Sequence, residues 1–149
     1  MNNLVVYTDA SLDAKGRSGI SVLFCEQSGK LVGAKGKKIK ARDIQDAELS
    51  AILFALESIP HTTKRAVIFN DNSSAVIAIS KKNSCLYRPS PIVCTIKKLI
   101  AAHPCDISVE WIPREKNSIA DAIAVMAVTG APISVPRGAN PLDNLNLNN

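Results

Sequence analysis

Leu4-Val5-Val6-Tyr7-Thr8-Asp9 is the stretch of the chain that decides the fold. A continuous run of apolar and β-branched residues is typical of a strand that is covered on both faces of a sheet. The run ends in an acid, Asp9, where a turn begins. The sequence therefore predicts a central strand over residues 4–8 with a carboxylate at its carboxyl end.

Strand and helix patterns follow one another around this first strand. A polar turn over 11–19 separates it from two strands that complete an antiparallel meander. A helix then begins after the N-cap residue Asp43, with Ile44 first on its apolar stripe. The segments predicted after the first turn are strands over 20–25, 31–39, 66–69 and 107–112, helices over 44–59, 73–80, 92–102 and 117–129, and a polar loop over 81–91.

This order predicts an α/β fold built on a five-stranded mixed sheet. The antiparallel three-stranded meander is joined by two parallel strands, because the last two strand-helix steps look like crossover connections. Helices are then expected on both faces of the sheet. We expect residues 1–129 to form this one domain and residues 130–149, which are rich in Asn and Pro, to form a flexible tail.

Composition excludes several classes of protein. A hydrophobic fraction of 46% and a charged fraction of 21% in 149 residues exclude a disordered or fibrous chain. No apolar run approaches a membrane span, and residues 1–20 carry charges that a signal peptide lacks. The four cysteines have no metal-ligand spacing, so a reduced, cytoplasmic chain is expected. The net charge of +5 hints at a polyanionic partner.

Four carboxylates stand at positions that need an explanation, and each has an ordinary alternative. Asp9 suits a turn and Asp71 suits a helix N-cap. Glu48 lies on the apolar stripe of its helix, where burying a carboxylate is costly. Its ordinary alternative is a partly exposed residue in the first turn, favoured by the helix dipole. Asp121 lies in an apolar helix, where Ser118 and Asp121 have the spacing of a capping box.

Taken together, these acids favour a metal site. If the first and fourth strands are neighbours, Asp9 and Asp71 end side by side, and the helices can bring the other two acids there. Four carboxylates repel one another and imply cations, and oxygen ligands without Cys or His select Mg²⁺ or Mn²⁺. Two such ions about 4 Å apart would stabilise the attacking and leaving oxygens of a phosphoryl transfer.

At these residues the chain resembles the ribonuclease H-like nucleases, and most closely the type 1 ribonuclease H domains found alone or attached to reverse transcriptases. The resemblance covers residues 1–129. The stretches that carry it are Tyr7-Thr8-Asp9-Ala10-Ser11, Asp46-Ala47-Glu48-Leu49, Asp71-Asn72-Ser73, and Ile112-Pro113-Arg114-Glu115-Lys116-Asn117 leading to Ala120-Asp121.

The resemblance implies cleavage of the RNA strand of an RNA–DNA hybrid, with a 5′-phosphate and a 3′-hydroxyl as products. It implies that Asp9, Glu48, Asp71 and Asp121 hold two Mg²⁺ ions, for which Mn²⁺ can substitute. The ribose 2′-hydroxyl distinguishes RNA from DNA in such a site. We expect a monomer with no membrane association; the sequence leaves open whether a polymerase or reverse transcriptase acts beside it.

A basic run precedes the first helix, with six Lys and Arg and no acid between residues 30 and 42. The resemblance places this run on the path to the substrate, where it would contact phosphates. The alternative is a solvated edge strand whose lysines prevent aggregation. The candidate substrate contacts are Ser11, Lys38, Lys40, Arg42, Gln45, Asn72 and Asn117.

The chain departs from the family pattern at three places. Trp111 stands where many members carry a His ten residues before the last metal ligand, which predicts slower turnover. It either stacks on a base or, as is more usual for a lone Trp, packs in the core. Ala10 replaces a frequent Gly, and Gln45 belongs to an altered segment before Glu48. Two other functions therefore stay open: a non-catalytic nucleic-acid-binding or scaffold domain, and a same-fold nuclease that acts on another nucleic acid.

Overall fold

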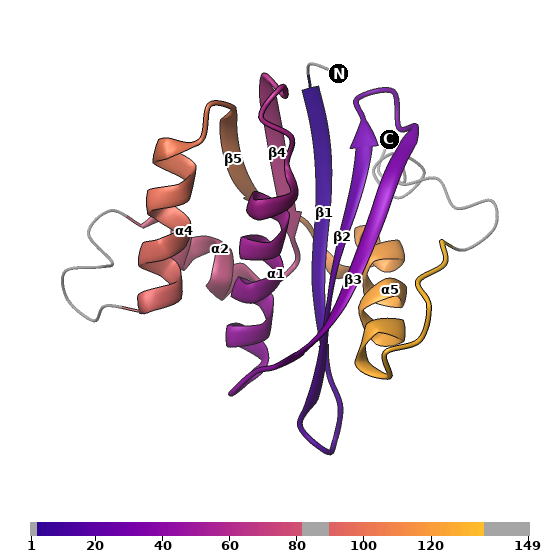
Figure 1. Cartoon of the computed structure of the whole chain (residues 1–149). Helices are drawn as coiled ribbons and strands as arrows, with labels where there is room; N and C mark the ends of the chain where they lie inside the picture. The colour runs from indigo at the N-terminus through magenta and orange to yellow at the C-terminus, as the bar shows by residue number, and fades with distance from the viewer. Residues whose placement is uncertain (1–2, 82–89, 136–149) are drawn as a thin grey trace.

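β1 (Asn3–Leu12) is the middle strand of a five-stranded sheet with the order β3-β2-β1-β4-β5, as Figure 1 shows. The structure is a computed structural model that describes residues 3–81 and 90–135. β1 pairs antiparallel with β2 and parallel with β4, and the outer strands continue each pattern. The remaining strands are β2 (Arg17–Glu26), β3 (Leu31–Lys40), β4 (Arg65–Asn70) and β5 (Asp106–Trp111). The predicted mixed sheet is confirmed.

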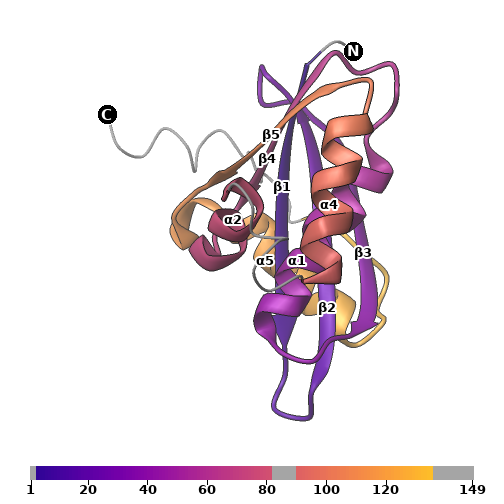
Figure 2. The same cartoon turned by 90° about the vertical axis from the view of Figure 1, so that its left-hand side faces the viewer.

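Helices cover both faces of the sheet, as predicted. Alternate residues of β1 point to opposite faces, so Leu4 and Val6 belong to one core cluster and Tyr7 to another. The first cluster is covered by α1, α2 and α4, and the second by α5; Figure 2 shows α4 and α1 in front of the sheet. The helices are α1 (Ile44–Ser58), α2 (Ser73–Ser80), α4 (Pro91–Ala102) and α5 (Ser118–Val128), with a 3₁₀ turn over Arg114–Lys116 before α5.

The first hairpin is tighter than predicted. β1 runs to Leu12 and β2 starts at Arg17, so the polar turn is four residues long, not the expected 11–19. The Asp13 carboxylate accepts hydrogen bonds from the backbone N–H groups of Lys15 (3.0 Å) and Arg17 (2.8 Å), and Gly16 adopts a left-handed φ of 77°. These local bonds close the turn early and let both strands extend.

The position of Asp9 is therefore different from the expected strand end. β1 pairs with β4 only as far as Tyr7, which lies opposite Phe69. Asp9 lies two residues further on, where β1 is still paired with β2 but no longer with β4. Space is left beside Asp9 because the pairing between β1 and β4 has already ended at Tyr7.

The start of α1 is partly as expected. Asp43 is the N-cap, and its side chain accepts a hydrogen bond from the Asp46 N–H at 2.8 Å. The prediction that Ile44 lies in the core is wrong, because this residue is 42% exposed. The buried face begins one turn later, because Ala47 and Ala51 pack on Ala10 of β1.

Residues 82–89 of the predicted polar loop and residues 136–149 of the predicted tail lie outside the described residues. Before that point, Ile133 and Val135 pack against the second core cluster. The domain boundary at residue 129 stays a prediction. Within the described ranges, none of the helices has the length and apolar character needed to cross a bilayer.

We expect Gly19→Ala to destabilise the fold, because α5 lies directly on β2 at this glycine. A Cβ at position 19 would lie 2.5 Å from the Val128 nitrogen and would overlap the Ala124 carbonyl oxygen. Overpacking against backbone costs about 1–3 kcal/mol or more. Gly33→Ala is the control, since nothing lies within 4 Å of its Cβ. Urea unfolding measures both, and equal stabilities would contradict the close packing of α5.

Candidate active site

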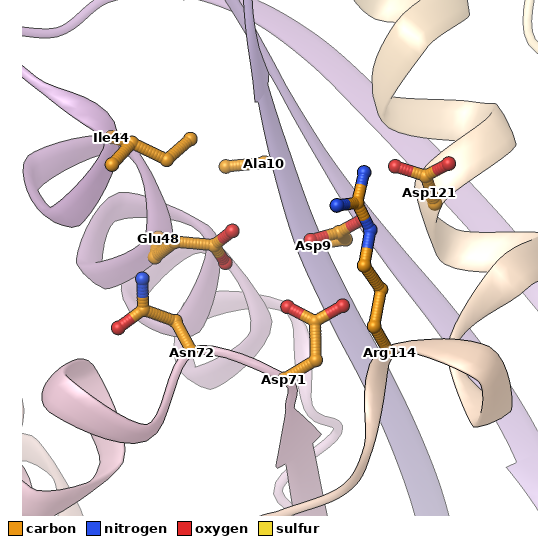
Figure 3. Close-up of a pocket in the computed structure, with 8 residues that line it drawn as sticks. All are labelled: Asp9, Ala10, Ile44, Glu48, Asp71, Asn72, Arg114 and Asp121. Carbon is orange, nitrogen blue, oxygen red and sulfur yellow. The ribbon is translucent and has the colours of Figure 1, made fainter.

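Three carboxylates converge where β1 and β4 stop pairing. Asp9 comes from β1, Glu48 from the second turn of α1, and Asp71 from the residue directly after β4. Each offers an oxygen, and these oxygens lie within 4.8 Å of one another. Asp9 and Glu48 are each only 3% exposed. The three acids line one cavity of about 300 Å³. Figure 3 shows their side chains directed into it.

Asp121 lies in the same cavity but is not part of that tight group. Figure 3 shows the Arg114 side chain in the cavity, with Asp71 on one side and Asp121 on the other. The four predicted acids are thus brought to one cavity, with three of them at ligand-sharing distance. Among the described residues, the cavity is lined by Asp9, Ala10, Ile44, Glu48, Asp71, Asn72, Arg114 and Asp121.

Burial, together with the charge of a neighbouring carboxylate, raises the pKa of each clustered carboxyl group above its usual range. For Asp9 burial is the main cause, followed by the charges of Glu48 and Asp71. Burial also raises the pKa of Glu48, although a hydrogen bond from Asn70 opposes it. The ion pairs Arg17–Asp13 and Arg65–Asp106 include none of the clustered acids. A bound cation would relieve this repulsion.

For Asp71, burial raises the pKa, while a hydrogen bond from Asn117 and the positive charge of Arg114 hold it back. Asp71 is therefore the clustered carboxylate whose charged form is favoured by the positive charge of Arg114. Arg114 belongs to the loop between β5 and α5, and its side chain is exposed at the mouth of the cavity.

Two buried amides hold the carboxylates in place. Asn70, with no exposed surface, donates from Nδ2 to Glu48 Oε2 at 2.8 Å and to Thr8 Oγ1 at 3.0 Å. Asn117, 1% exposed, donates from Nδ2 to the Thr8 carbonyl at 2.9 Å and to Asp71 Oδ2 at 3.4 Å. Both amides are anchored on Thr8, so each orients a different carboxylate against β1.

The segment that carries Asp71 is fixed by a further local bond. Asn70 Oδ1 accepts the Asn72 N–H at 2.8 Å, which closes a turn around Asp71. Asn72, not Asp71, is the N-cap of α2, since its Oδ1 accepts the Ala75 N–H at 2.9 Å. The N-cap alternative for Asp71 is therefore wrong, and the Asp71 carboxylate is free to face the cavity.

The ordinary alternatives for Glu48 and Asp121 are also wrong. Glu48 is buried, not partly exposed. The capping box is absent in this described segment because Asn117 is the N-cap of α5, which places Ser118 inside the helix and Asp121 one position too far along.

The candidate substrate contacts lie at different depths. Lys38 and Lys40 are exposed on β3, an edge strand of the sheet, while Arg42 and Gln45 are exposed at the start of α1. Ser11 is half-buried near the end of β1, Asn72 lines the cavity, and Asn117 is buried beneath Asp71. Asn117 thus lies where it holds a carboxylate and not where a duplex would rest.

Trp111 is not a core residue, contrary to the more usual alternative. Its side chain is 52% exposed at the end of β5. The indole Nε1–H donates to the Asp71 carbonyl oxygen at 3.0 Å.

Sequence reasoning missed Asn70 and Arg114 as parts of the site, although both lie within quoted motifs or beside them. An amide directly before Asp71 at the end of a buried strand was the available signal for Asn70. Arg114 gave no signal of its own, since a loop arginine before a helix is ordinarily solvated.

Comparison with known proteins gives a family and a fold. The sequence model of a family described as reverse transcriptase-like matches residues 7–127. LC11-RNase H1, isolated from compost by a metagenomic approach, is 22% identical with a TM-score of 0.75, over 87% of this chain and 97% of that chain. RNase H1 from the halophilic archaeon Halobacterium salinarum NRC-1 is 19% identical with a TM-score of 0.72, over 87% of this chain and 100% of that chain.

A second structure, of LC11-RNase H1 in complex with an RNA/DNA hybrid, matches with 19% identity and a TM-score of 0.72, over 85% of this chain and 96% of that chain. No curated protein matches the chain. At these identities the solved structures establish a shared fold.

We expect the metal-free protein to be more stable at pH 5 than at pH 8. A carboxyl group whose pKa is raised in the folded state stabilises the fold below its unfolded pKa near 4, and that stability is lost as the pH rises through the raised folded value. Asp9 and Glu48 both have pKa values shifted in this direction. Thermal melts in EDTA measure the effect, and Asp9→Asn should reduce the difference between the two pH values. A melting temperature in EDTA that rises from pH 5 to pH 8 would contradict the assignment.

Proposed function

Because the chain belongs to the reverse transcriptase-like family and has the fold of type 1 ribonuclease H, we propose that it hydrolyses the RNA strand of RNA–DNA hybrids. The observation that carries the proposal is the convergence of three carboxylates, two of them buried, in one cavity. We propose cleavage by two Mg²⁺ ions, leaving a 5′-phosphate and a 3′-hydroxyl.

The donor set fits such ions. All the clustered ligands are hard carboxylate oxygens, which suit Mg²⁺ and Mn²⁺. Asp9, Glu48 and Asp71 would hold the metal, with Asp121 as a further ligand from across the cavity. Bound ions of this kind activate water and stabilise the attacking and leaving oxygens at phosphorus.

The chain's own residues prepare this chemistry before the substrate arrives. Asn70 and Asn117 hold Glu48 and Asp71 in fixed orientations, so little reorganisation is needed when the substrate binds. Arg114, exposed at the cavity mouth, can pair with the scissile phosphate through two parallel hydrogen bonds.

The exposed basic residues Lys38, Lys40 and Arg42 are proposed to contact the phosphate backbones of the hybrid, and Gln45 is proposed to donate to a sugar. These contacts carry affinity that falls with salt. The solved hybrid complex of LC11-RNase H1, which shares the fold, supports a hybrid as the ligand to test first.

Cleavage is tested with an end-labelled RNA–DNA hybrid and with Asp71→Asn. The wild-type protein should cut only the RNA strand, with Mg²⁺ and not in EDTA. Asp71→Asn should lower the rate about 100-fold or more, because a clustered ligand loses its charge, while hybrid binding persists.

Glu57→Gln, an exposed acid of α1, is the control for the charge change and should cleave normally. Active Asp71→Asn, or full cleavage in EDTA, would refute the proposal. Binding without any cleavage by the folded wild-type protein would favour the scaffold function, and cutting of another duplex would favour the same-fold nuclease.

Arg114→Ala should separate substrate binding from metal binding. Losing the guanidinium should lower kcat/KM roughly 10- to 100-fold, since hydrogen bonds between charged groups at a phosphate contribute about 1.5–3 kcal/mol. Mn²⁺ affinity should not fall, because a positive charge beside Asp71 is removed. Steady-state kinetics and calorimetric Mn²⁺ titration measure the two effects. Arg65→Ala, on the exposed start of β4, is the control; unchanged kcat/KM in Arg114→Ala would exclude a phosphate contact.

A further inference from the structure

Trp111, the one tryptophan of the sequence, is hydrogen-bonded to the backbone of Asp71, a residue of the carboxylate cluster. It is the last residue of β5 and pairs with Asn70, the last residue of β4. The next backbone N–H, of Ile112, donates to the Asn70 carbonyl at 3.1 Å. The sheet therefore fixes Trp111 beside the segment that carries Asp71.

The indole group fixes that segment through a hydrogen bond. Its Nε1–H donates to the Asp71 carbonyl at 3.0 Å, while the Asn70 side chain accepts the N–H of the neighbouring Asn72 at 2.8 Å. The backbone around Asp71 is thus held at two points. A shift of the Trp111 ring would move the carbonyl of a residue in the carboxylate cluster.

The ring nevertheless exposes half of its surface. Trp111 is 52% exposed. The indole N–H, its one hydrogen-bond donor, is already bonded to the Asp71 carbonyl, so the exposed part of the side chain is an apolar ring surface. An aromatic face that is open to solvent is available for stacking on another flat group. The loop that follows Trp111 presents Arg114 to the carboxylate cavity.

An aromatic face next to an arginine is the combination with which proteins bind single nucleic-acid strands. Bases stack on the ring and the cation meets the phosphate, with little dependence on sequence. Arg114, which lines the cavity three residues after Trp111, offers a cation to a phosphate group. A stacking face together with a phosphate-binding cation favours a nucleic-acid strand over a protein as the occupant.

We propose that Trp111 stacks on the nucleic-acid strand that enters the site, and that its N–H makes it a positioning residue for Asp71. The proposal rests on the proposed function, because the strand belongs to the hybrid substrate. Substrate binding and the orientation of a metal ligand would then depend on the same side chain.

Fluorescence of the lone tryptophan tests the contact without any catalysis. The protein is titrated with an uncut, dye-labelled hybrid in EDTA; anisotropy of the dye reports binding, and acrylamide quenching reports the exposure of Trp111. Quenching should fall about two-fold at saturation, since stacking covers the exposed half of the ring. Binding without this protection would overturn the proposal, whereas absence of binding would instead refute the proposed function.

Two substitutions separate the ring from its N–H group. Trp111→Ala should raise the Kd for hybrid roughly 5- to 100-fold, the usual effect of losing one base–aromatic stack. Trp111→Phe keeps a ring but no donor, so Kd and KM should change less than about threefold while kcat falls roughly 3- to 10-fold.

Val32→Ala is the matched control, because Val32 is a 46% exposed apolar side chain of β3 outside the carboxylate cavity. Wild-type affinity in Trp111→Ala would overturn the stacking contact. Wild-type kcat in Trp111→Phe would overturn the positioning role.

Discussion

Electrostatic repulsion among Asp9, Glu48 and Asp71 is the constraint on which the rest of the structure depends. Their oxygens lie within 4.8 Å of one another, and two of the side chains are almost fully buried. Burying like charges together is unfavourable, and each group responds with a pKa above its ordinary range. A bound cation would offset this repulsion, which gives the arrangement a physical reason.

Several local features hold the acids together against this repulsion. The β1–β4 pairing stops at Tyr7, which leaves room beside Asp9. The small residues Ala47 and Ala51 let α1 approach Ala10 on β1, and so bring Glu48 in. The side-chain amides of Asn70 and Asn117 then donate hydrogen bonds to the carboxylates of Glu48 and Asp71. The stability of the fold and the readiness of the site are thus connected through Thr8, which both amides contact.

The sequence was sufficient for the fold and for the acids, but not for what surrounds them. The continuous apolar and β-branched run over residues 4–8 predicted a strand covered on both faces, and the β-β-β-α-β-α-α-β-α order predicted the sheet. Residues 73–80 were predicted as a helix and form α2. These predictions were confirmed because the local sequence pattern and the burial in the fold agree in those segments.

The failures arose where long-range contacts override a local pattern. The length of the first hairpin depends on side-chain bonds of Asp13, and Ile44 is exposed because α1 approaches the sheet only one turn later. The roles of Asn70 and Trp111 depend on partners that are distant in the sequence: Asn70 contacts Thr8, 62 residues away, and the Trp111 indole contacts Asp71, 40 residues away. Such pairings follow from the folded topology, which no single segment encodes.

The most direct test of this account is a crystal structure of the protein soaked in Mn²⁺, with data collected at the manganese absorption edge. The account predicts an anomalous peak within coordination distance of Asp9, Glu48 and Asp71. No peak there at saturating Mn²⁺, with the three side chains still clustered, would contradict the claim that the fold brings these carboxylates together to bind a metal.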